Sequence, residues 1–317
     1  PDRDRRGGMI SVLRPLLVRA AELVALLFGV TTLLFFLLRV ADDPATVIGG
    51  EQATPELLAE IRAAYGFDRP LPVQYLLYLS QIARLEFGTS IANDLPALSL
   101  VLERLGPTLL LAGLALLFTL AVAVPLGAWL GMRPDAPLRR GVSGLVFVAQ
   151  GIPGYVVGLL LIQLFAVQLG WLPSIGAETP AAWILPAATL AAFLVPKLTR
   201  VLAANVAEAL REDYIRTARA HGAPPAVILL RHALPNALLG ATALIGTQFA
   251  FLISGALTTE VIFAWPGLGR LLIASVQVLD FPVVQASVFV IAAMVFAVNG
   301  ITDVLFRLID PRLRGTR

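Results

Sequence analysis

The sequence predicts an all-α polytopic membrane protein with six transmembrane helices, and three observations carry this prediction. Hydrophobic residues make up 58% of the 317 residues, and the mean hydropathy of +0.83 exceeds what a soluble domain needs. Long runs contain no charged residue, and a membrane span needs about 20 apolar residues. These charge-free runs cover residues 105–132, 141–177, 179–196, 233–259 and 281–302. A sixth apolar run, Leu23 to Leu38, lies between Arg19 and Arg39, whose side chains reach the interfaces.

Charge placement predicts the orientation of these spans. The first 19 residues are rich in arginine, and basic residues also follow the second and sixth spans, so both termini are expected in the cytoplasm. Residues 41–103 carry an acidic excess, which predicts a small helical extracytoplasmic segment after the first span. In it Thr54 is expected to cap a helix that has Pro55 in its first position and that ends at Gly66. Met9 is a possible start, so residues 1–8 are either native or an added extension. The first span lacks a small-residue cleavage site, which predicts an uncleaved anchor.

The expected segments follow from these runs and charges. They are a cytoplasmic tail at 1–13, spans at 14–40, 104–131, 142–169, 183–205, 237–260 and 282–306, the extracytoplasmic segment at 41–103, a cytoplasmic loop at 208–236 and a cytoplasmic tail at 310–317.

The loop is a dense polar island between two apolar runs, and it holds both histidines of the chain. Asp213 is expected to cap a short helix, because its carboxylate accepts from unpaired N–H groups. Gly222 is expected to end that helix with a positive φ. Pro224-Pro225 suits the first turn of a second helix, and Pro235 marks the turn into the next apolar run. The pattern predicts two amphipathic helices around a glycine corner, a socket for a soluble partner. An ordinary basic loop is the alternative.

The spacing of this loop resembles the EAA loop of importer-type ABC permeases. Arg216-Thr217-Ala218 is followed after three residues by Gly222 and after nine more by His232-Ala233-Leu234-Pro235. The form DYIRTARAHG with LLRHALPNAL is similar to the dipeptide, oligopeptide and nickel branch, as are VIFAWPGLGRLL and the closing Asp310-Pro311-Arg312. The resemblance covers about residues 10–314. The sequence departs from the branch at His221, where a lysine is usual, and at Ala41-Asp42-Asp43-Pro44.

The resemblance implies a permease subunit of an ABC importer in the bacterial inner membrane, with residues 104–309 as the permease core. It implies a second, distinct permease subunit, two ABC ATPase subunits that carry ATP and Mg, and an extracytoplasmic solute-binding protein. Peptides are the implied cargo, with nickel or another small solute as the alternative. Tyr214, Ile215 and Ala218 would pack into a groove of the ATPase. The full set of residues implied to couple to the ATPase is Asp213, Tyr214, Ile215, Arg216, Thr217, Ala218, Arg219, Gly222, Leu234 and Pro235.

The sequence lacks motifs for nucleotide binding, metal binding and catalysis. It contains no Gly-x-x-x-x-Gly-Lys-Ser/Thr loop, no His-Glu-x-x-His and no cysteine, and both histidines lie in the surface loop. The sequence therefore predicts no catalytic residue, no metal site and no cofactor in this chain, and lipid rather than nucleic acid as its surroundings. An ion-coupled carrier or a membrane enzyme is the alternative class, and the carrier would need charges deep in the spans.

Small and polar residues inside the spans are candidates for the pathway or its gating. Gly151, Pro153 and Gly154 predict a broken place in the third span, because proline frees a carbonyl and glycine allows close approach. Asn299 lies in the inner half of the sixth span.

Two charged residues near the spans have alternative interpretations. Glu260 either pairs with Arg270, which is the favoured interpretation, or faces the cavity. Lys197, the only lysine, lies at membrane depth, and it is expected to extend its ammonium to the inner surface rather than act in the pathway.

Overall fold

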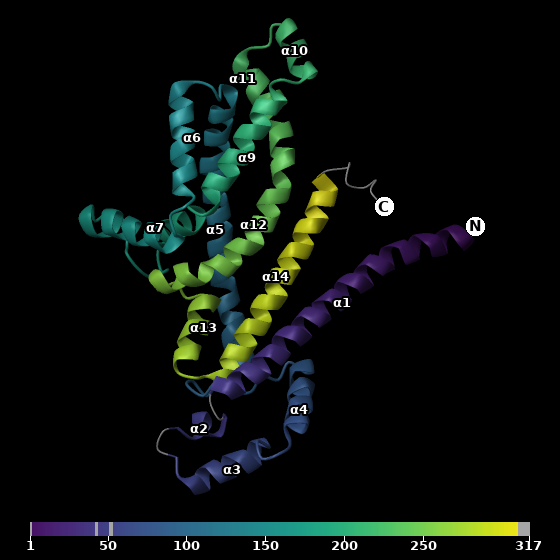
Figure 1. Cartoon of the computed structure of the whole chain (residues 1–317), viewed down its shortest axis with the longest axis vertical. Coiled ribbons are helices and arrows are strands. Elements are labelled where there is room, and N and C mark those ends of the chain that lie inside the picture. The colour runs from purple at the N-terminus through teal and green to yellow at the C-terminus, as the bar shows by residue number, and fades with distance from the viewer. Residues whose placement is uncertain (1, 42–43, 51–52, 310–317) are drawn as a thin grey trace. The chain divides into compact units, whose positions relative to one another are not determined.

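A computed structural model describes residues 2–41, 44–50 and 53–309. The predicted turn at Asp42-Asp43 and the closing tail 310–317 lie outside the described residues. In the described part every element is a helix, apart from one isolated bridge between Thr89 and Pro96 (Figure 1). The elements are α1 (Asp2–Ala41), α2 (Pro44–Gly49), α3 (Pro55–Tyr65), α4 (Leu71–Ala83), α5 (Ala97–Met132), α6 (Pro137–Ala149), α7 (Gly154–Leu161), η1 (Ile162–Gln168), η2 (Pro180–Trp183), α8 (Ile184–Ala191), α9 (Leu194–Ala209), α10 (Asp213–Ala220), α11 (Pro225–Val227), η3 (Ile228–Ala233), α12 (Leu234–Ile262), α13 (Leu268–Gln277) and α14 (Phe281–Ile309).

Four helices in the described part are long and apolar enough to cross a membrane, and the number rises to six if two bent pairs each count as one span. The four are Leu17–Arg39, Ala97–Met132, Leu244–Ile262 and Phe281–Val304. The bent pairs are Pro137–Ala149 with Gly154–Gln168, at 105°, and Pro180–Ala191 with Leu194–Ala209, at 60°. The prediction of an all-helical polytopic chain is confirmed. The pair at the expected third span is broken, as predicted, and the pair at the fourth, which was expected as a single helix, is broken as well.

Proline chemistry accounts for both breaks. Pro153 precedes α7, and a proline disfavours helical conformation in the residue before it, here Ile152. This is the broken place that the sequence predicts in the third span. The bend between α8 and α9 falls at Ala192 and Phe193. Pro196 stands in the first turn of α9 and has no N–H to donate to Ala192, so the helix does not continue straight.

The described chain forms two compact units, which we treat separately. The first is Pro1–Arg104 with Leu271–Phe296. In it Phe35 is fully buried, and its ring lies 5.1 Å from that of Tyr75 and 5.3 Å from that of Tyr78. The predicted ends of α3 are confirmed: Thr54 accepts from the Leu57 N–H at 3.3 Å, and Gly66 ends the helix at φ 71°.

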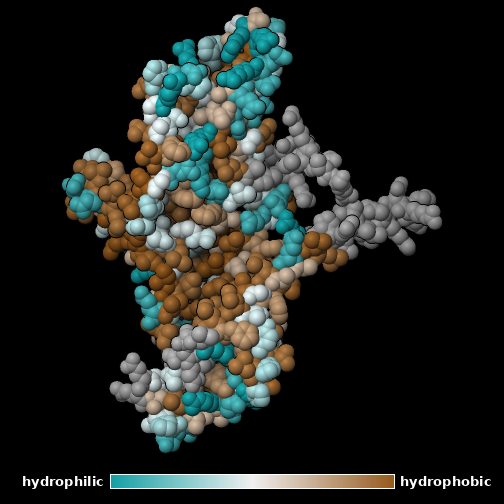
Figure 2. All heavy atoms as spheres, viewed as in Figure 1, coloured by the Kyte–Doolittle hydropathy of each residue, from teal (hydrophilic) through white to brown (hydrophobic). Residues whose placement is uncertain are grey.

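The second unit is Leu105–Arg270 with Ala297–Arg317. Its helices α5 and α9 approach closely through glycine: a Cβ at Gly131 would lie 2.8 Å from the Val206 Cβ. Its core joins α5, α8, α9 and α12 through Leu111, Leu190, Leu194, Leu198, Leu202 and Leu252. Figure 2 shows hydrophobic side chains over α7 and hydrophilic ones around α10. This contrast within one unit suits a lipid-facing middle and a water-facing end.

Candidate functional site

The α9–α10 junction begins the predicted coupling segment. Helix α9 ends at Ala209, and α10 begins after Glu212, whose extended backbone (φ −67°, ψ 152°) makes it the N-cap residue without a side-chain capping bond. The prediction that Asp213 caps α10 is therefore wrong. Asp213 is the first helical residue, and its carboxylate instead pairs with Arg216 at 3.2 Å. An acidic residue in the first turn is still favourable there, because the helix N-terminus carries partial positive charge.

The glycine corner has the predicted conformation. Gly222 has φ +77°, in the left-handed region. The N–H of Gly222 donates to the Arg219 carbonyl at 2.9 Å, and that of Ala223 donates to the Ala218 carbonyl at 3.1 Å. These bonds satisfy carbonyls at the end of α10, as a left-handed C-terminal residue commonly does. His221 Nδ1 lies 2.8 Å from the Thr217 carbonyl and adds a further contact at this end.

The second half of the segment is helical and joins the next span without a turn. Pro224 precedes α11 and Pro225 opens it, as expected. Helix α11 then continues through η3 into α12, which begins at Leu234. The prediction that Pro235 marks a turn is wrong, because Pro235 lies in the first turn of α12, where a missing N–H costs little.

One face of α10 is buried against the same chain. Ile215 is fully buried in a cluster with Ala209, Ile228 and Ala233, and the half-buried Ala218 packs against this cluster. The expectation that Ile215 enters a partner's groove is therefore wrong, since its side chain is already enclosed. Ile215 and Ala218 instead fix α10 to the ends of α9 and η3.

The opposite face of α10 is exposed and hydrophilic. The exposed residues of α10 are Asp213, Tyr214, Arg216, Thr217, Arg219 and Ala220, and Gly222 just beyond its end is exposed too. The salt bridge between Asp213 and Arg216 has both side chains largely in water, so it contributes little to stability. Both arginines of this face are therefore available to an acidic partner.

Two asparagines that were not among the predicted site residues make hydrogen bonds in this region, Asn236 within the segment and Asn205 between α9 and α12. Asn236 donates to the Tyr214 hydroxyl at 3.1 Å and to the His232 carbonyl at 2.8 Å. Asn205 on α9 donates to the Ala237 carbonyl at 3.0 Å. Their position at the ends of apolar runs is the sequence signal that could have identified them, because a polar amide there needs a hydrogen-bond partner.

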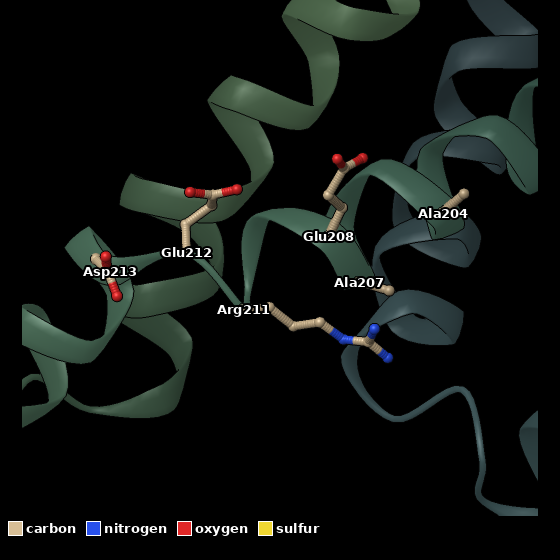
Figure 3. A pocket seen from close by; sticks show the side chains of 6 residues that line it. All are labelled: Ala204, Ala207, Glu208, Arg211, Glu212 and Asp213. Atoms are coloured by element: carbon tan, nitrogen blue, oxygen red, sulfur yellow. The ribbon is translucent and has the colours of Figure 1, made fainter.

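A hollow of about 510 Å³ lies at the α9–α10 junction. It is lined by Ala204, Ala207, Glu208, Arg211, Glu212 and Asp213. Figure 3 shows the Arg211 side chain extending away from the carboxylates of Glu208 and Glu212. Glu208, Arg211 and Glu212 were not among the predicted coupling residues, although they belong to the same polar island. With three acids and one arginine, the hollow favours a basic group.

At the other end of α12, Glu260 is fully buried. Its carboxylate accepts from the Thr108 hydroxyl at 2.6 Å and from the N–H groups of Gly269 at 2.7 Å and Arg270 at 3.1 Å. The Arg270 guanidinium donates instead to the Ala264 carbonyl. The predicted ion pair between the two side chains is wrong, and so is the alternative of a carboxylate facing a cavity. Glu260 holds the turn Trp265–Gly269 in place.

The other pathway candidates lie apart from one another. Gly151 and Pro153 form the break between α6 and α7, and Gly154 borders a small hollow beside α8 and α12. Asn299 lies exposed on α14.

Comparison with known protein families identifies the family of this chain. Residues 123–315 match the model of the binding-protein-dependent transport system inner membrane component, and residues 12–112 match the model of its N-terminal part. The chain belongs to this family of inner membrane components. It is thus a permease subunit of an ABC importer, a multi-pass protein of the bacterial inner membrane.

Relatives of this permease agree over nearly its whole length. It is 36% identical to the glutathione transport system permease protein GsiC of Salmonella choleraesuis (strain SC-B67), over 96% of this chain and 99% of that one. It is also 36% identical to GsiC of Escherichia coli (strain K12), over 93% and 97% of the two chains.

Two solved structures share the fold of this permease at 22% sequence identity each. The MetNI methionine ABC transporter, in an inward-facing conformation, matches with a TM-score of 0.55 over 68% of this chain and 98% of that one. An amino acid ABC transporter crystallised with histidines matches with a TM-score of 0.51, over 68% and 94% of the two chains.

Proposed function

We propose that this permease forms, with a second and distinct permease subunit, the pathway for short peptides of the glutathione class. The assembly has two ATPase subunits, which bind ATP and Mg, on the α10 side, and a solute-binding protein on the opposite side. The chain crosses the membrane six times, with each bent pair as one span and both termini in the cytoplasm. Residues 41–103 lie outside, and residues 104–309 form the permease core.

The observation that carries the coupling role is the two-faced α10. Its inner face is enclosed around Ile215, whereas its outer face is exposed and carries Arg216 and Arg219. A partner that pushes on the outer face moves α9 and η3 with it, because the buried cluster joins them to α10, and η3 continues directly into α12. An ATPase dimer that closes on ATP supplies such a push, and the rigid spans then expose the pathway to alternate sides.

Individual residues have distinct parts in this proposal. Tyr214 offers its ring to a groove of the ATPase while Asn236 holds its hydroxyl. Arg216 and Arg219 pair with acids or carbonyls at the rim of that groove. Gly222 sets the angle of the corner, and Leu234-Pro235 passes the movement to α12. Asp213 and Thr217 keep the first turns of α10 helical, with the Thr217 hydroxyl bonded to the Asp213 carbonyl at 3.1 Å.

A cross-linking experiment tests the coupling role. The chain has no cysteine, so Arg219→Cys introduces a single one. Disulfide cross-linking to cysteines placed around the groove of the cognate ATPase is expected, and ATP is expected to change its yield. The matched control is Arg140→Cys, an exposed position in the first turn of α6. Equal yields for the two variants would contradict the proposed docking.

An uptake experiment tests the cargo. The cognate permease pair, ATPase and binding protein are reconstituted in vesicles, and uptake of labelled glutathione, dipeptides and Ni²⁺ is compared with and without ATP. We expect ATP-dependent uptake of glutathione or dipeptides that requires the binding protein. Uptake of Ni²⁺ without either peptide would contradict the peptide assignment and favour the nickel alternative.

A further inference from the structure

The described spans of the second unit contain few charged residues, and two of these lie close together on α9. Between Glu178 and Glu208 only Lys197 and Arg200 are charged, and both lie on α9. The Lys197 ammonium lies 3.8 Å from the centre of the Phe193 ring and 5.6 Å from that of Phe251. These two rings stack at 4.7 Å with an interplanar angle of 13°.

The direction of Lys197 contradicts the expectation that its ammonium extends to the inner surface. Phe193 lies one turn before Lys197 on α9, so the ammonium points back toward the α8–α9 bend and away from α10. Within the part of the chain that the structure describes, no carboxylate pairs with it. The Lys197 side chain is half-buried, and an aromatic face supplies only part of the hydration lost there, so an anionic partner would stabilise its ammonium.

A hollow of about 190 Å³ lies beside these two rings. Phe193 and Phe251 border it, and so do Thr189, Thr258 and Thr259. Thr189 is 1% exposed, and its hydroxyl has no hydrogen-bond partner among the described residues. A buried hydroxyl without a partner is rare in a folded protein and marks a place where a ligand or water completes the bond. The hollow is smaller than a site for a whole ligand of drug size, so it suits one end of a solute.

We propose that this hollow and Lys197 form a subsite in the spans that binds a carboxylate of the solute during transport. The inference rests on the proposed function, because short peptides carry a free carboxylate. Lys197 does not line the hollow itself, but its ammonium lies against the rings of Phe193 and Phe251, which do, so it supplies the charge beside the hollow while the Thr189 hydroxyl donates a hydrogen bond. Both broken spans meet this subsite, through Gly154 on one side and the α8–α9 bend on the other.

The test uses the complete complex in vesicles and two labelled probes that differ only in charge, a dipeptide with a free C-terminal carboxylate and its C-terminal amide. For Lys197→Met we expect the concentration for half-maximal uptake of the acid to rise roughly tenfold, as loss of one charged hydrogen bond predicts, with little change for the amide. Lys197→Arg keeps the charge and is expected to keep most of the preference. Arg140→Gln removes one exposed charge in the first turn of α6, which does not line the hollow, and is expected to leave both probes unchanged.

The outcomes separate the two proposals. If wild type transports the acid and Lys197→Met transports it with the same half-maximal concentration, the subsite is refuted and the peptide assignment remains. If Lys197→Met weakens uptake of acid and amide equally, Lys197 serves assembly rather than carboxylate binding, and the subsite is again refuted. If wild type transports neither probe, the peptide assignment fails and the subsite fails with it. Recovery of the assembled complex by size-exclusion chromatography, checked for every variant, shows whether a loss of uptake reflects a folding defect.

Discussion

Two turns in the second unit both depend on glycine, yet they are held by different forces. The corner at Gly222 is exposed, and a Cβ built there would meet no atom within 4 Å. The turn Trp265–Gly269 is enclosed, and a Cβ at Gly267 would overlap the Glu260 carboxylate. The exposed corner therefore depends on backbone conformation, whereas the enclosed turn depends on space and on hydrogen bonds to a buried charge.

The backbone angles support this contrast. Gly222 has φ +77°, which glycine adopts without strain. Directly before the enclosed turn, Ala264 has a positive φ of 52°, which is unfavourable for alanine. The bonds from Gly269 and Arg270 to Glu260 hold the chain there despite that cost. The exposed corner at Gly222 has no such bonds to a buried side chain, which suits the proposed coupling role.

The largest expected effect comes from removing the buried carboxylate. Glu260→Ala leaves the Thr108 hydroxyl and the N–H groups of Gly269 and Arg270 without their acceptor. Each buried polar group left unpaired costs about 1–3 kcal/mol, so we expect a loss of about 3 kcal/mol or more and poor recovery of folded protein. Size-exclusion chromatography and the thermal midpoint of the detergent-purified complex measure this.

Glu260→Gln is the matched control, because its amide oxygen still accepts hydrogen bonds at the same place. We expect its thermal midpoint to fall between those of wild type and Glu260→Ala. A normal midpoint for Glu260→Ala would mean that packing alone holds the turn, and the contrast between the two turns would be lost.

Gly222→Val is expected to affect transport rather than folding. A β-branched side chain at φ +77° is strained by about 1–3 kcal/mol, and the exposed corner relieves this strain by changing its angle. We expect the protein to reach the membrane, ATP hydrolysis to continue and uptake to fall about tenfold or more. Vesicle uptake and ATPase activity of the complete complex, measured in parallel, distinguish a loss of transport from a loss of ATP hydrolysis.

Gly222→Asn serves as the control, because asparagine tolerates the left-handed region. Uptake near the wild-type rate is expected for it. Equal uptake by the valine variant and wild type would show that the angle at this corner does not govern coupling.

The sequence predicts those features that local chemistry determines. The ends of α3 at Thr54 and Gly66, the positive φ of Gly222 and the break before Pro153 all follow from residues within one turn of the feature. The helical class follows from the apolar runs. These features need no knowledge of which segments meet in space.

The features that the sequence did not predict depend on residues far away in the chain or on which face of a helix is packed. Thr108 lies 152 residues before Glu260, so nothing local favours their hydrogen bond over the predicted ion pair with Arg270. Tyr214 and Ile215 are adjacent apolar residues, and only the packing of α9 and η3 decides that Ile215 is enclosed and Tyr214 exposed.

The smallest expected effect concerns the charges on α10. Asp213→Asn breaks the pair with Arg216, in which both side chains are largely exposed. We expect the free energy of unfolding to change by less than about 0.5 kcal/mol, so that the thermal midpoint stays close to that of wild type. An effect on uptake without a change in stability would support the proposed contact of Arg216 with the ATPase. A large fall in the midpoint would contradict the comparison, since it would place an interaction essential to the fold on the exposed face. Thr108→Val, which removes the hydroxyl between Glu260 and the Leu268 N–H, is the reference for an enclosed polar contact and is expected to cost more.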